Sequence, residues 1–194
     1  MDASIQAAIW GGTIAAMATV TGYLANQALA RRERKATSFA NALTAMDRYE
    51  DYPYRVWRRV SDDSETMTRL TDEWSAAGMA VKFHLAWLEV DSPVVGMAYR
   101  LLYDAVRPSR IANRNAAWNA PPRQHGNDMA AEPPLTWSDS SAAKALCLAS
   151  MRNEIGPLSR LRHRSLHAQI AAVATQAHRN RAGHPANPAN PANP

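Results

Sequence analysis

The sequence predicts an all-α fold, with an N-terminal transmembrane helix, an antiparallel helical bundle and a disordered Pro-rich C-terminal tail. Composition is the first observation behind this prediction. Among 194 residues there are 38 Ala but only two Phe and eight Gly, and Ala and Arg favour helices whereas strands prefer β-branched and aromatic residues. The second observation is that apolar residues recur every three or four positions, as in amphipathic helices. The third is a long uncharged run near the N-terminus.

The uncharged run covers residues 5–30 and contains no Asp, Glu, Lys or Arg. A helix of about 20 apolar residues crosses a bilayer core, although Ala, Gly and Thr make this run only modestly hydrophobic. A basic cluster follows it, which consists of Arg31, Arg32, Arg34 and Lys35. We therefore interpret residues 1–30 as a single-pass transmembrane anchor whose basic cluster contacts anionic lipid headgroups of the inner leaflet. This topology places the N-terminus outside the cell membrane and the remaining chain in the cytoplasm.

Two other interpretations of the run stay open. Ala28-Leu29-Ala30 has the form of a signal-peptide cleavage site, but the segment lacks the basic start of a signal peptide. The run is also compatible with a buried helix in a soluble bundle. If it lies in lipid, small residues on one face favour close helix packing and hence a homo-oligomer. The small residues that share such a face are Ala8, Gly12 and Ala16.

Residues 31–118 are expected to form helical hairpins or a bundle. The helix of the anchor should continue to Pro53 and end there, because proline removes a backbone donor. A second helix is expected after an Asp62 N-cap, and it carries the strongest periodic signal in the chain. Its predicted inward face consists of Met67, Leu70, Trp74, Ala77, Val81, His84 or Leu85, and Leu88. This face predicts the seam of a helical bundle.

A third helix is predicted to start at Ser92 and Pro93, since serine suits the N-cap and proline the first helical turn. Pro108 is expected to stop it. A shorter helical piece is expected over residues 111–118.

The chain after this region divides into three parts. Residues 119–137 contain four prolines and no apolar period, so they are expected to form a loop. Residues 138–182 are expected to form a basic helical region that breaks at Gly156. Residues 183–194 repeat Pro, Ala and Asn, which predicts a disordered tail because such a composition cannot bury a core.

Two stretches, FANALTAMDRYEDYPYRVWRR and FHLAWLEVDSPVVGMAYRLLYDAVR, carry a resemblance to a known group of proteins. They are similar to small uncharacterised single-pass membrane proteins of actinobacterial genomes and their phages. The likeness covers residues 24–120 and includes the anchor helix, the basic cluster, a Tyr-Pro-Tyr-Arg turn and an Ala-Trp-Leu…Pro-Val hairpin. It implies a membrane-anchored helical protein. Because no activity comes with that group, it assigns no functional residue.

Few residues suggest chemistry. His163 and His167 have the spacing of metal ligands on one helix face, but Glu154 is the only acid near them in the sequence. We therefore expect two solvated histidines there, and we predict no metal, no cofactor and no catalytic residue. The lone Cys147 is expected to be a small buried hydrophobe.

The function expected from these features is that of a membrane-anchored, non-enzymatic interaction or regulatory protein of phage or mobile-element origin. Its partners are predicted to be the membrane and either another protein or further copies of the chain. Arg55, Arg58 and Arg59, with aromatic residues between them, form a candidate partner surface. The alternative is a soluble helical nucleic-acid-binding protein that uses the six Arg of residues 152–181 to contact phosphates.

Overall fold

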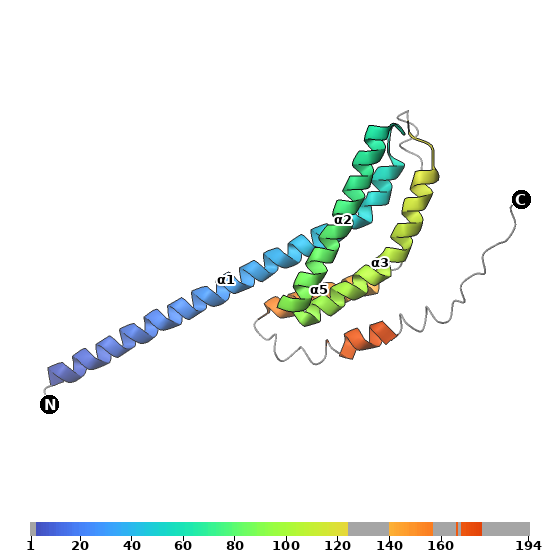
Figure 1. Ribbon diagram of the computed structural model, residues 1–194. Coiled ribbons are helices and arrows are strands. Elements are labelled where there is room, and N and C mark those ends of the chain that lie inside the picture. Colours follow the sequence, from blue (N-terminus) through green and yellow to red (C-terminus); the bar gives the residue numbers. More distant parts are fainter. Residues whose placement is uncertain (1–2, 124–139, 157–165, 167, 176–194) are drawn as a thin grey trace, which may run out of the picture. The chain divides into compact units, whose positions relative to one another are not determined.

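The structure is a computed structural model that describes the backbone of residues 3–123, 140–156, 166 and 168–175, and their side chains from residue 17 onward. Figure 1 shows the helices, which are α1 (Ala3–Trp57), α2 (Ser64–Asp91), α3 (Pro93–Asn119) and α5 (Ser141–Ile155). Residues 168–175 are also helical. No strand occurs in these ranges, so the predicted all-α fold class is confirmed.

Internal contacts divide the chain into two units, residues 1–40 and residues 41–194, with the boundary inside α1. In the first unit, the described side chains of residues 17–34 are all exposed. Across the described residues, no helix combines the length and the hydropathy that a membrane crossing requires. The transmembrane part of the fold prediction is therefore not confirmed.

In the second unit, α2 packs against α3 and α3 packs against α5. The part of α1 that belongs to this unit is joined to the other helices by buried tyrosines. The Tyr52 hydroxyl donates a hydrogen bond of 2.6 Å to the carbonyl oxygen of Leu70 on α2. The Tyr99 hydroxyl on α3 donates one of 2.8 Å to the carbonyl oxygen of Ala42. These bonds fix three helices against one another without leaving a buried hydroxyl unsatisfied.

The predicted inward face of α2 is confirmed over most of its length. Its buried residues are Leu70, Val81, Leu85 and Leu88. Trp74 and Ala77 are half-buried, whereas Met67 is exposed and does not belong to the core.

Two predicted helix ends were wrong, and in both cases a proline lies inside a helix that continues. Pro53 is buried within α1, which runs four residues further to Trp57. Pro108 lies within α3, which runs on to Asn119 and includes the piece predicted separately over residues 111–118. Figure 1 shows that α3 is bent along its length, as expected of a helix that contains proline. Burial of Val56 and Trp57 beyond the first proline offsets the missing hydrogen bond.

The start of α2 lies one residue later than predicted. Its N-cap is Asp63, whose carboxylate accepts a hydrogen bond of 2.8 Å from the Thr66 backbone N–H. Hydrogen bonds from Ser61 and Thr66 lower the pKa of Asp63 to about 2. Asp62, the predicted cap, instead forms an ion pair of 2.5 Å with Arg59.

The hairpin between α2 and α3 is tight, as predicted at Ser92 and Pro93. Ser92 is the N-cap residue of α3 and Pro93 lies in its first turn, although the serine side chain makes no capping hydrogen bond. Gly96 allows the two helices to meet, because a Cβ at this position would lie 2.7 Å from the backbone Cα of Glu89. No larger residue fits there without a shift of the helices.

The C-terminal part agrees with the prediction where it is described. Helix α5 ends at Ile155, immediately before Gly156. Cys147 is buried in α5, as predicted, and burial raises the pKa of its thiol to about 12. The predicted loop over residues 119–137 and the predicted tail over residues 183–194 lie largely or wholly outside the described residues.

Candidate functional site

A groove of about 720 Å³ lies between residues 41–55 of α1 and residues 73–84 of α2, within the second unit. Its width comes from short side chains that face each other across the two helices. These are Ala45 on α1 and Ala76, Ala77 and Ala80 on α2. Since side chains on a helix recur on one face every three or four residues, the alanines of α2 line one continuous face.

Tyr52 closes one end of the groove as a rigid wall. Its hydroxyl is held by the carbonyl oxygen of Leu70, and its ring packs at 4.8 Å, centroid to centroid, on the ring of Trp74. Burial raises the pKa of Tyr52 to about 12. The phenol therefore stays protonated and keeps donating its hydrogen bond at physiological pH.

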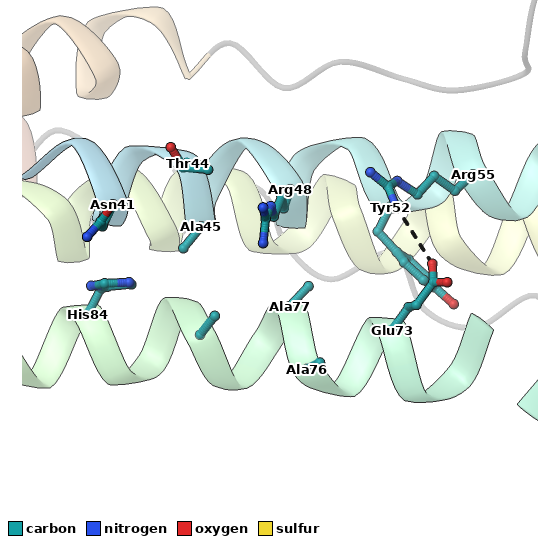
Figure 2. A pocket seen from close by; sticks show the side chains of 11 residues that line it. Asn41, Thr44, Ala45, Arg48, Tyr52, Arg55, Glu73, Ala76, Ala77 and His84 are labelled. Carbon is teal, nitrogen blue, oxygen red and sulfur yellow. Dashed lines mark ion pairs between the residues drawn. The ribbon is translucent and has the colours of Figure 1, made fainter. Parts of the chain in front are cut away.

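The charges at the same end are paired. Arg55 on α1 forms ion pairs with Asp51 at 3.0 Å and with Glu73 on α2 at 3.8 Å, the second of which is drawn in Figure 2. Glu73 also binds Arg69 at 2.9 Å. These exposed pairs contribute little to stability, but they hold the side chains that border the groove.

Arg48 is the charge in the middle of the groove. Its side chain points from α1 toward α2 in Figure 2, and it is exposed. Within the part of the chain that the structure describes, no carboxylate forms an ion pair with it. A guanidinium with five donors is thus available to a ligand that carries a carboxylate or phosphate group.

His84 and Asn41 face each other across the other end of the groove (Figure 2). His84 or Leu85 was predicted for the inward face of α2. Leu85 is the buried one of the two, whereas His84 is half-buried and borders the groove, in edge contact with Phe83. Desolvation lowers the pKa of His84, so at neutral pH its imidazole is uncharged. It then offers one donor and one acceptor at this end of the groove.

The three arginines of the predicted partner surface lie in different environments. Arg55 borders the groove, and Arg58 is exposed with its guanidinium 5.0 Å from the ring centroid of Tyr54. Arg59 is buried, so its assignment to a partner surface was wrong.

Arg59 is a structural clamp between the ends of α1 and α3. Its guanidinium donates to the carbonyl oxygens of Ala117 at 2.7 Å and Ala120 at 2.6 Å, and also binds Val56, Trp118 and Asp62. These carbonyl groups include some that the end of a helix leaves without an internal partner. The arginine therefore caps α3 and cannot reach a partner without opening the fold.

The remaining predicted residues either do not line the groove or lie outside the described residues. Arg31, Arg32 and Arg34 are exposed on α1 in the first unit, with Lys35 half-buried beside them. The backbone at Ala8, Gly12 and Ala16 is helical, but their side chains are not among those described. The pair His163 and His167 lies outside the described residues, as does most of the basic region at residues 152–181. No cluster of three metal-binding side chains occurs within the described ranges.

The groove was not predicted from the sequence. Arg48 and the alanines of α2 are individually ordinary, and only the packing of α1 against α2 brings them together. Comparison with protein-family models, curated proteins and solved structures finds no match to this chain.

Proposed function

We propose that this chain is a helical interaction protein that binds a partner protein in the groove between α1 and α2, and that residues 1–30 anchor it in the cell membrane. The groove is the observation that carries the proposal. It combines an apolar floor of alanines with an available guanidinium, that of Arg48, and a neutral imidazole, that of His84.

The chemistry of the groove favours binding over catalysis. Arg48 and Arg55 offer guanidinium donors for hydrogen bonds and ion pairs rather than groups for proton transfer. Glu73 is held by two arginines, and the raised pKa of Tyr52 keeps its proton in place. A general acid and base need pKa values near the working pH, and among the side chains that line the groove only the imidazole of His84 is a group of that kind. These side chains suit instead a segment with small apolar residues beside an Asp or Glu that pairs with Arg48.

Photocrosslinking in cells tests this role of the groove. A benzoyl-phenylalanine placed at Ala80 on its floor should give a defined adduct with a partner protein, and Arg48→Glu should remove that adduct. The same probe at Ala112, an exposed position on α3, is the matched control and should give none. Identical adducts from both positions, or none from Ala80, would contradict the proposal.

The membrane part of the proposal is supported by the first unit. The described side chains from Met17 to Ala30 are uncharged and exposed, among them Val20, Leu24 and Leu29. A surface with many exposed apolar side chains is typical of one that contacts a second apolar phase, which here would be lipid. The basic cluster that follows would contact anionic headgroups on the cytoplasmic side, with the N-terminus outside.

Carbonate extraction of cell membranes tests the anchor. The full chain should stay in the membrane pellet, and the double variant Val20→Arg, Leu24→Arg should move to the supernatant because charge at the centre of a span opposes insertion. Ala36→Arg, which adds charge beyond the uncharged run, is the control and should stay in the pellet. Release of the intact wild-type chain would defeat this part of the proposal.

A further inference from the structure

Helix α2 carries an exposed apolar stripe on the face opposite its buried one. The exposed fractions are 68% for Met79, 65% for Phe83, 52% for Trp87 and 85% for Val90. At 100° per residue these side chains point within about 40° of Phe83. The stripe lies beside the groove, and Ala76 borders both. Four large apolar residues on one helix face are more than scattered surface hydrophobes, which occur singly.

The spacing of the stripe is the same in both directions along the helix. From Ala76 through Met79, Phe83 and Trp87 to Val90, the steps are three, four, four and three residues. Phe83 is therefore the centre of a symmetric pattern. A second α2 laid antiparallel against the first places Phe83 on Phe83, Met79 on Trp87 and Ala76 on Val90. Each pair after the first joins a smaller side chain to a larger one, as close packing requires.

We propose that a second copy of this chain docks on the stripe, in a two-fold dimer made by antiparallel α2 helices. A two-fold interface uses the same patch on both copies, so a pattern that matches itself when reversed is what it needs. In the antiparallel arrangement the two helix dipoles point in opposite directions, which is electrostatically favourable. This inference goes beyond the proposed function and does not depend on the groove or on the anchor.

Charge at the edge of the stripe agrees with this partner. Lys82 and Glu89 lie seven residues apart and hence on one edge of α2. In the antiparallel pair, Lys82 of one copy lies within about 8 Å, along the helix axis, of Glu89 of the other. Glu89 binds Arg100 at 2.6 Å through its Oε1 atom, which leaves Oε2 for this contact.

The area suits a reversible dimer. The stripe exposes on the order of 500 Å² of apolar side-chain surface per copy. Two copies together would bury about 1,000 Å², at the lower limit of specific interfaces.

Sedimentation equilibrium of the full chain, in density-matched detergent, tests the dimer. The wild type should be dimeric at micromolar concentration. Phe83→Asp and Phe83→Lys, each alone, should weaken association by about tenfold or more, because the pairing sets like charges against each other. An equimolar mixture of the two variants should recover the dimer, since position 83 then faces an opposite charge. Only a pairing in which Phe83 meets Phe83 predicts this rescue.

Val60→Asp is the matched control, because Val60 is exposed to a similar extent, 61%, but lies outside the stripe. It should leave the dimer unchanged. Circular dichroism melting should show that all three variants fold, as expected for exposed positions. A wild-type monomer, a mixture that stays monomeric, or a dimer that survives Phe83→Asp would overturn the inference. The last result would assign self-association to another segment. The carbonate extraction does not depend on any of these outcomes, and neither does an Ala80 adduct whose second chain is a different protein.

Discussion

The guanidinium of Arg59 lies 2.7 Å from the carbonyl oxygen of Ala117, and this contact joins residues 58 positions apart. Because Arg59 donates to the end of α3 from the end of α1, one side chain fixes the relative position of two helices. The same helix α1 lines the groove with its residues 41–55. Substitutions that test this framework therefore test the scaffold on which the groove is built.

Replacement of Arg59 by Ala is expected to lower the free energy of unfolding by about 3 kcal/mol, because several buried carbonyl groups lose a charged donor. Urea unfolding followed by circular dichroism measures this. Arg58→Ala is the control, since Arg58 is exposed and its contact with the Tyr54 ring is on the surface. It should change stability by about 0.5 kcal/mol or less. Equal losses from the two variants would show that Arg59 is not the clamp.

Two glycines of the second unit should respond to alanine with opposite signs. Gly96→Ala places a Cβ against the backbone of Glu89, so α2 and α3 must separate, at a loss of about 1–3 kcal/mol. Gly78→Ala meets nothing within 4 Å and should gain up to about 1 kcal/mol from helix propensity. Thermal unfolding of both variants decides the matter. A gain in stability from Gly96→Ala would refute the close approach in the hairpin.

The periodicity of α2 is strong enough that its core residues could be predicted from the sequence. Leu70, Val81, Leu85 and Leu88 repeat at helical spacing, and burial follows because a packed helix must hide its apolar face. The predicted helix ends at Pro53 and Pro108 failed for the opposite reason. The rule considers only the backbone N–H that proline lacks and not the tertiary packing of the residues beyond it. Burial of those residues stabilises the continued helix more than the missing hydrogen bond destabilises it.

The role of Arg59 and the groove could not be predicted for the same reason, which is that their residues lie far apart along the chain. The carbonyl acceptors of Arg59 at the end of α3 lie 58 to 61 residues away. Without them, the run of arginines and aromatic residues that contains Arg59 was interpreted as an exposed surface. The groove needs Ala45 and Arg48 of α1 opposite Ala76, Ala77 and Ala80 of α2. Alanine is common throughout the chain, and nothing in its local spacing distinguishes a groove floor from an ordinary helix.

Stability should fall at alkaline pH. Burial raises the pKa of Cys147 from 9.0 to about 12, so the folded chain keeps a proton that the unfolded chain releases. The contribution of this thiol to the free energy of unfolding is fully present below pH 9 and is lost as the pH rises toward 12. In that range the slope is up to about 1.4 kcal/mol per pH unit. Urea unfolding between pH 8 and 11 should show a shallower slope for Cys147→Ala than for wild type, and equal slopes would contradict the assignment.

The last prediction concerns the wall of the groove and compares two buried tyrosines that both pack on Trp74. Ring centroids lie 5.0 Å apart for Tyr49 and 4.8 Å apart for Tyr52, so phenylalanine keeps the ring packing at either position. Only the hydroxyl of Tyr52 bonds to Leu70 across the two helices. Tyr52→Phe should therefore cost about 1 kcal/mol in urea unfolding, because the Leu70 carbonyl loses its second donor. Tyr49→Phe should be close to neutral, and similar losses from both variants would mean that the hydroxyl of Tyr52 does not fix α1 to α2.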